Sequence, residues 1–164
     1  TFISEGGGNW REESRRLAAA GFTGDQSVRV SHSANQSTTS GVDFAMAWDT
    51  EQFDSNAFHD TVTNNSRLTV PAGQGGKYLI IACIDWQGSS TGARSVTIEI
   101  NALTTLAIVT NAPLSVATNV LATTLDNLAA GDYARVLVNQ TSGGALNAIG
   151  GNRYNSYFAM IRIA

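Results

Sequence analysis

The stretch NSRLTVPAGQGGKYLIIACIDW, residues 65–86, decides the fold. It opens with a polar turn, a proline and a Gly-rich turn, and continues into a run in which almost every side chain is apolar. A strand with one face in water should alternate between apolar and polar residues. This run instead carries apolar residues on both faces: Tyr78, Ile80, Ala82, Ile84 and Trp86 on one, and Leu79, Ile81 and Cys83 on the other, which ends at Asp85.

Each of the two apolar faces of this strand must pack against another protein surface. One face covers the core of a sheet sandwich, and a large apolar patch is uncommon on the surface of a monomer. We expect other copies of the same chain, arranged around a symmetry axis, to cover the second face. The alternative is that the chain's own loops cover it. The residues predicted at the interface between copies are Tyr78, Leu79, Ile81 and Cys83.

The remaining apolar pattern has a period close to two. Residues 42–48, 96–101, 133–140 and 157–163 all alternate, and clusters of Gly, Asn, Asp and Ser separate them. No strong helical pattern lies between these segments. The sequence therefore predicts an all-β fold, an antiparallel sandwich of two sheets.

Composition narrows the function. Charged residues make up 14% of the 164-residue chain, the net charge is −3, and Lys77 is the only lysine. This is far from the basic balance of nucleic-acid-binding proteins, so we expect no nucleic-acid partner. No apolar run reaches the ~18 residues of a membrane span, so we expect no membrane insertion. The single Cys83 excludes an intrachain disulfide.

Residues 1–27 differ in composition from the rest and are predicted to form an arm. Asn9 and Glu12 have the spacing of a capping box that would begin a short helix, and Gly21 is placed to end it. The segment has too few apolar residues to build a core of its own, which implies a partner. The alternative is a loosely docked terminus without a role. If the arm docks, the predicted contacts are Trp10, Arg11, Arg15 and Arg16.

Residues suited to catalysis or metal binding are sparse. His32 and His59 lie in polar, turn-like segments without zinc spacing. Asp49, Glu51, Asp54 and Asp60 raise the question of calcium, but acidic residues at turns normally accept hydrogen bonds from their own backbone. We expect no catalytic residue, no cofactor and no metal site.

A family resemblance rests on several motifs in order. AWDTEQFDSNAFHDTVTNNSRLTVPAGQGGKYLIIACIDW resembles the first half of the bacterial and phage type of the complement C1q globular-head family, which is similar in fold to tumour necrosis factor. SVRVSHSANQSTTSGVDF resembles its opening strand and turn, and GARSVTIEIN, LAAGDYARVLVNQTSGGALN and SYFAMIRIA resemble its later strands. The turn GQGGK, residues 73–77, is longer than the family's usual Gly-Tyr turn.

The resemblance covers residues 28–164 and implies a ten-stranded jelly roll that forms a compact homotrimer. It divides the chain into the arm, residues 1–27, and a C1q/TNF-like jelly roll, residues 28–164. The opening TFISEGGGNWREESRRL also resembles, over few residues, the start of a different class of small phage head-decoration proteins.

Two function classes stay open at this point, because fold alone does not choose between them. The first is a non-enzymatic virion structural protein, a trimeric capsid decoration protein whose arm binds the major capsid protein. The second is a receptor- or glycan-binding tip of a tail fibre, or a secreted recognition module, that grips a host-surface sugar or protein. The absence of coiled-coil or collagen-like repeats before residue 28 favours the first. We expect the protein in a phage virion, on the capsid surface or the tail, and soluble when free.

Overall fold

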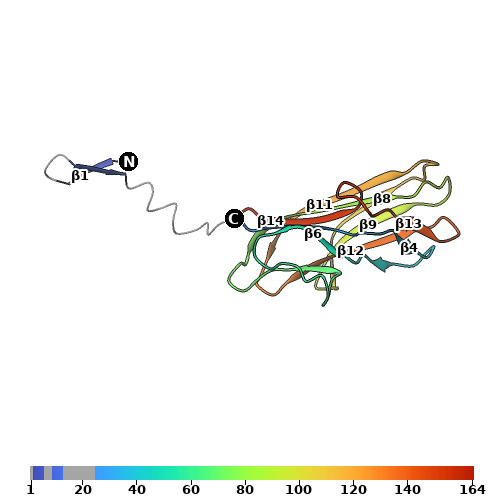
Figure 1. The fold of residues 1–164 in the computed structure, drawn as a ribbon, viewed down its shortest axis with the longest axis horizontal. Coiled ribbons are helices and arrows are strands. Elements are labelled where there is room, and N and C mark those ends of the chain that lie inside the picture. The colour runs from blue at the N-terminus through green and yellow to red at the C-terminus, as the bar shows by residue number, and fades with distance from the viewer. Residues whose placement is uncertain (1, 6–8, 13–24) are drawn as a thin grey trace.

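The computed structural model describes residues 2–5, 9–12 and 25–164. All regular structure within these residues is β-strand. Residues 25–164 form two antiparallel sheets that enclose one core (Figure 1). The two-sheet sandwich predicted from the period-two segments is therefore confirmed.

The smaller sheet has five strands. Its centre is the pairing of β9 with β12, in register from Ile100 opposite Ala134 to Arg94 opposite Gln140. Alternate side chains on these strands enter the core, as the sequence predicted. The strand order is β10 (Thr104–Asn111), β9 (Arg94–Ile100), β12 (Tyr133–Gln140) and β5 (Phe44–Ala45), with β7 (Arg67–Thr69) also pairing with β12.

The larger sheet has seven strands and is organised around the long central strand β8. One edge of β8 pairs with β11 over its full length, from Thr118 opposite Trp86 to Leu128 opposite Gly76. The strand order of the sheet is β4 (Gln36–Thr38), β13 (Leu146–Ala148), β8 (Gly76–Trp86), β14 (Tyr157–Arg162), β3 (Ser27–Ser31) and β6 (Thr50–Asp54), and β11 is Thr118–Leu128.

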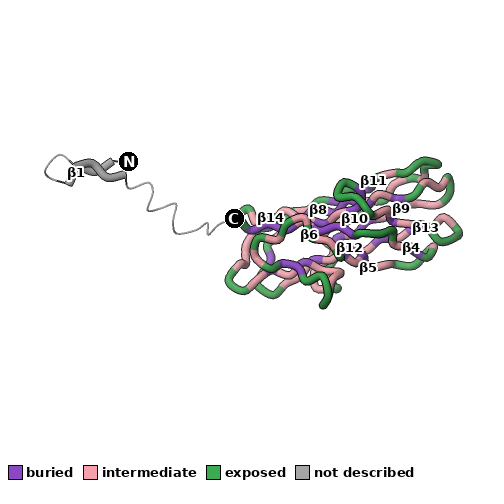
Figure 2. The backbone as a smooth tube through the Cα atoms, in the orientation of Figure 1, coloured by how far each residue is buried: buried purple, intermediate pink, exposed green. Residues whose placement is uncertain are grey.

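The core lies between the two sheets, where buried and more exposed positions alternate along the strands (Figure 2). Aromatic pairs connect the layers of side chains: the rings of Trp48 and Phe158 are 5.9 Å apart, and those of Phe58 and Tyr78 meet edge to face at 6.0 Å. Aromatic rings in such offset or edge-to-face arrangements stabilise the core beyond the contribution of the area they bury.

Loops gather at two ends of the sandwich. One end, called here the C-terminal end, holds the loops 55–66, 101–103 and 129–132 and the final residues 163–164. Strand β3 begins at this end, because Ser27 pairs with Ile161 near the end of β14. The chain that precedes residue 25 therefore joins the body at the C-terminal end.

Residues 2–5 and 9–12 of the arm form an antiparallel pair of strands. Strand β1 (Phe2–Glu5) pairs with β2 (Asn9–Glu12), with Glu5 opposite Asn9 and Phe2 opposite Glu12. The helix predicted to begin at Asn9 is wrong at its start, because the backbone there is extended and pairs with a second strand. The rest of that predicted helix lies outside the described residues. No helix in the described part of the chain has the length and apolar character of a membrane span.

Candidate functional site

The outer side of the larger sheet is the first candidate site. Along β8, Tyr78, Ile80, Ala82 and Ile84 are fully buried, whereas the alternate Leu79 and Ile81 remain partly exposed on the opposite side. The inner set faces the other sheet across the core. Within residues 25–164, no second layer of strands covers the outer set. The strand has the two apolar faces that the sequence predicted, and the outer one is uncovered by this part of the chain.

Neighbouring strands extend this surface. β11 and β14 flank β8, and their outward residues fall in rows with those of β8 because the pairing is in register. Leu125 is 63% exposed, Leu121 51% and Ile161 40%. We call this surface the outer apolar face; it consists of Leu79, Ile81, Cys83, Leu121, Leu125, Ala159 and Ile161.

Two of the four predicted interface residues need separate comment. Tyr78 is a correction: it is fully buried in the core, its hydroxyl donates to the Gln74 carbonyl, and burial raises its pKa. Even-numbered residues of β8 point inward, so Tyr78 has no surface to offer a second copy. Cys83 lies on the outer side but is only 6% exposed. Burial, and then the charge of Asp85, raise the pKa of its thiol, so it is a packed, unreactive group.

Polar groups lie near the outer apolar face. The guanidinium of Arg29 stacks on the Tyr157 ring, 4.2 Å from its centroid, and donates to the Arg153 carbonyl at 2.9 Å. Asp85 follows Cys83 on the outward side of β8, and burial raises the pKa of its carboxyl group. The side chains of Arg29 and Asp85 are both half-buried in the single chain.

The acidic residues considered for calcium each serve a local structure. Asp49 accepts hydrogen bonds from Ser33, and Asp54 accepts three from the backbone of the loop that follows it. Glu51 lies 3.1 Å from His59. Asp60 accepts from two backbone N–H groups of its own turn. Among the described residues, no group of three or more His, Cys, Asp and Glu side chains converges as a metal site would require.

Both histidines are buried. His32 Nδ1 lies 2.5 Å from the Ala34 carbonyl, and the ring packs 5.7 Å from Trp48. His59 sits between Glu51 and the carbonyl of Asn65. Neither ring faces a serine or cysteine nucleophile in the hydrogen bonds of the described residues, and both positions hold loops in place.

The predicted docking residues of the arm fall partly outside the described residues. Trp10 and Arg11 belong to β2, where they pair with Ser4 and Ile3. Arg15 and Arg16 lie outside the described residues.

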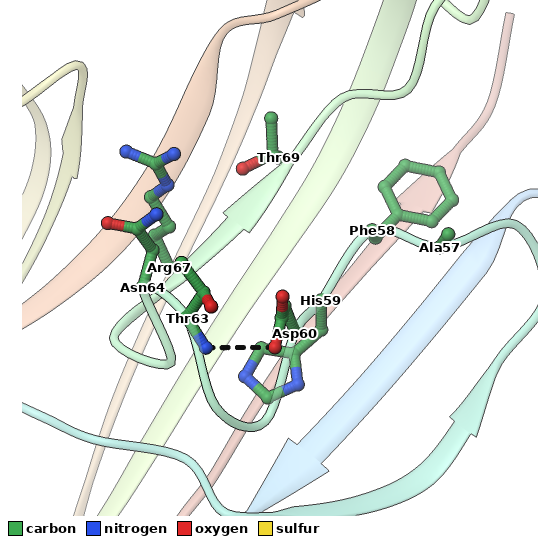
Figure 3. Close-up of a pocket in the computed structure, with 8 residues that line it drawn as sticks. All are labelled: Ala57, Phe58, His59, Asp60, Thr63, Asn64, Arg67 and Thr69. Carbon is green, nitrogen blue, oxygen red and sulfur yellow. Dashed lines mark hydrogen bonds between the residues drawn. The ribbon is translucent and has the colours of Figure 1, made fainter.

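A second candidate site is a hollow of about 180 Å³ at the C-terminal end, between the 55–66 loop and β7 (Figure 3). Arg67, Asn64, Asp60 and Thr69 line it. The sequence analysis missed this site, since the SRLTVP segment carries no signal beyond the start of a strand. The contact that marks it, Arg67 over the ring of Tyr133, joins residues far apart in the sequence.

Comparison with solved structures identifies the fold. Murine APRIL matches with a TM-score of 0.63 at 10% identity, covering 85% of this chain and all of that one. Eiger TNF from S. frugiperda matches with a TM-score of 0.62 at 17% identity, covering 85% of this chain and 93% of that one. The globular domain of zebrafish complement 1qA matches with a TM-score of 0.58 at 13% identity, covering 85% of this chain and 98% of that one.

The body is a C1q/TNF-like jelly roll. The expected fold is thereby confirmed, while identities this low establish the fold alone. No family model and no curated protein sequence matches the chain. The function of this jelly roll must therefore be argued from its surfaces.

Proposed function

We propose that this chain is a non-enzymatic structural protein of a phage virion, a homotrimeric jelly roll that decorates the capsid and binds the major capsid protein through residues 1–27. The observation that carries the proposal is the outer apolar face. Its central strand contributes Leu79 and Ile81, which are partly exposed, and its flanking strand β11 contributes Leu121 and Leu125, which are each more than half exposed in the single chain. Covering these side chains requires another surface of similar character.

Copies of the same chain supply that surface at least cost, because closed rotational symmetry buries the same patch on every protomer. A three-fold axis also places the three copies of residue 25 at one level along the axis. Three arms would then leave the trimer toward one surface. Simultaneous attachment at several points strengthens binding by raising the effective concentration of each further contact.

The proposal assigns the protein no catalytic role, and the structural roles of its aspartate and histidine side chains support this. Asp54 and Asp49 hold loops through backbone and hydroxyl hydrogen bonds. His32 is 3% exposed and His59 8%. A general base must be free to take a substrate proton, whereas these four side chains are engaged with backbone, hydroxyl or carboxylate partners of the loops.

The arm is proposed to supply the contact with the capsid. Trp10 would act as an apolar anchor, since buried aromatics dominate interface energies, and Arg11, Arg15 and Arg16 would pair with acidic groups on the shell. The test compares the full chain with a chain lacking residues 1–27 for binding to undecorated capsids, after sedimentation has shown that both have the same assembly state. We expect loss of binding on deletion.

Full-length Trp10→Ala and the double variant Arg15→Gln, Arg16→Gln should weaken capsid binding, whereas Arg153→Gln, which removes an exposed charge from the body, should not. Undiminished capsid binding by the truncated chain would refute docking through the arm. If the full chain binds no capsid but binds bacterial cells or immobilised glycans, the capsid role is wrong and the protein is the recognition module.

A further inference from the structure

Six of the eight residues that line the hollow at the C-terminal end have polar side chains, and Ala57 and Phe58 complete the lining. Figure 3 shows Asp60, Thr63 and Asn64 from the loop, and Arg67 and Thr69 at the start and end of β7, around one space. Its volume of about 180 Å³ is far above the ~10–15 Å³ that a single water needs. The space is therefore large enough for a small polar molecule.

The loop that forms the hollow is held in one shape. Asp54 accepts hydrogen bonds from the N–H groups of Phe58 and His59 at 3.0 and 2.8 Å, and the His59 ring is fixed between Glu51 and the loop backbone. Ala57 and Asn64, on either side of the hollow, adopt left-handed conformations, with φ of 57° and 58°. Side-chain-bearing residues rarely adopt this conformation unless the surrounding structure imposes it, and such residues cluster at binding sites.

Arg67 has unused hydrogen-bonding capacity. Its guanidinium stacks over the Tyr133 ring, 4.4 Å from the centroid, which orients the group. Its Nε is buried without a hydrogen-bond partner, and among the described residues no carboxylate pairs with the guanidinium. Arg135, its register partner in β12, differs in this respect: it forms an ion pair with Glu99 at 2.9 Å. A guanidinium held flat, with free N–H groups, fits a carboxylate.

The other polar groups favour a polyhydroxylated ligand over a simple anion. One oxygen of Asp60 accepts from the N–H groups of Val62 and Thr63 at 2.8 and 2.9 Å, which leaves the second oxygen free to accept. The side chains of Asn64 and Thr69 make no hydrogen bond among the described residues, and both donate and accept. An acidic protein side chain would satisfy Arg67 but would leave Asp60, Asn64 and Thr69 without hydrogen-bond partners.

We propose that this hollow binds a carboxylate-bearing saccharide, with the carboxylate on Arg67 and the sugar hydroxyls on Asp60, Asn64 and Thr69. The site belongs to the jelly roll itself. It does not depend on the proposed capsid role, and the failure of either proposal leaves the other standing.

The test titrates the full chain with glucuronate, galacturonate and N-acetylneuraminate and follows the backbone amides and the arginine Nε–H groups by NMR. Glucose serves as the neutral sugar and acetate as the carboxylate without hydroxyls. At least one acidic sugar should shift the signals of Asn64, Arg67 and Thr69 saturably, and both controls should bind at least about ten-fold more weakly, the factor expected when a charge-assisted hydrogen bond is lost.

Arg67→Gln should lower the affinity for the acidic sugar by at least about ten-fold. The isosteric Thr69→Val should lower it to a smaller extent, and Arg153→Gln, which removes the same charge from a distant loop, should leave it unchanged. If Arg67→Gln disturbs the fold, Arg67→Lys keeps the charge without the planar fork and should still weaken binding. The proposal is overturned if no acidic sugar binds, if acetate or glucose binds as tightly, or if Arg153→Gln weakens binding as much as Arg67→Gln.

Discussion

Leu125 of β11 lies directly opposite Leu79 of β8, and both side chains point away from the core. Leu125 is 63% exposed, whereas Tyr78 and Ile80, which flank Leu79 along β8 and point into the core, are fully buried. Cross-strand pairs of this kind stabilise a sheet only modestly. The pair belongs to the outer apolar face, which we propose is buried when copies of the chain assemble.

We predict that the protein sediments at three times its chain mass of 17.3 kDa at micromolar concentration. Leu125→Asp should shift the mass toward that of the monomer, because a charge buried at an interface without a partner typically costs several kcal/mol. The side chain is mostly exposed in the single chain, so this substitution should leave the jelly roll folded.

The matched control is Ile108→Asp. Ile108 is also 63% exposed, but it belongs to β10 in the other sheet. The trimer should tolerate this change. A wild-type protein that sediments as a monomer would contradict the trimer, and equal dissociation by both variants would show that the outer apolar face is not the interface.

The sequence predicted most of the sheet structure because side-chain alternation is a local property. The inward residues of β9 and β12, such as Val96 and Val138, are buried as their spacing indicated. Alternation fixes which residues share a face, but not where the other strands lie. Val42 alternates in phase with Met46 and Trp48, yet it is 52% exposed whereas they are buried, because only Phe44–Ala45 of that segment forms a strand.

The sites were harder to predict because they depend on contacts between distant residues. The outward residues of β8 were found from the two-sided apolar pattern, whereas Tyr78, which alternation places on the inward face, was wrongly included among the interface residues. The hollow was missed altogether. Its defining feature is that Arg67 stacks on Tyr133 and has no carboxylate partner within the described part of the chain. Both features depend on tertiary contacts, which the local sequence pattern does not contain.

Asp54 is predicted to be the main anchor of the 55–66 loop. Its carboxylate accepts hydrogen bonds from the backbone of Asn56, Phe58 and His59 at 3.1, 3.0 and 2.8 Å. Asp54→Ala should lower the free energy of unfolding by about 2–3 kcal/mol, since hydrogen bonds to a charged group are the strong ones and their donors would lose a partner. Denaturant unfolding at a fixed protein concentration measures the change.

Asp43→Ala is the control for this prediction. Asp43 is exposed and accepts one hydrogen bond, from the Asn139 side chain at 2.7 Å. Its loss should change stability by no more than about 0.5 kcal/mol, as for most surface substitutions. If the two variants lose similar stability, the loop does not depend on Asp54.

His32 is predicted to make the protein less stable as the pH falls below neutrality. Burial lowers the pKa of its imidazole below 6.5, against smaller opposing effects of the Ala34 carbonyl and the charge of Asp49. Its Nδ1 lies against the Ala34 carbonyl, so a second proton would go to Nε2, which is buried without a partner. The unfolded chain therefore takes up a proton near pH 6.5 while the folded chain does not, and the state that binds more protons is stabilised as the pH falls.

The free energy of unfolding should decrease as the pH drops through 6.5 and level off below the pKa of the folded state. An NMR titration of the two histidines should show the His32 ring titrating below 6.5, and His32→Gln should remove its part of the pH dependence of stability. Titration of His32 at or above 6.5, or an unchanged pH dependence in the variant, would show that burial of this ring does not control stability in this range.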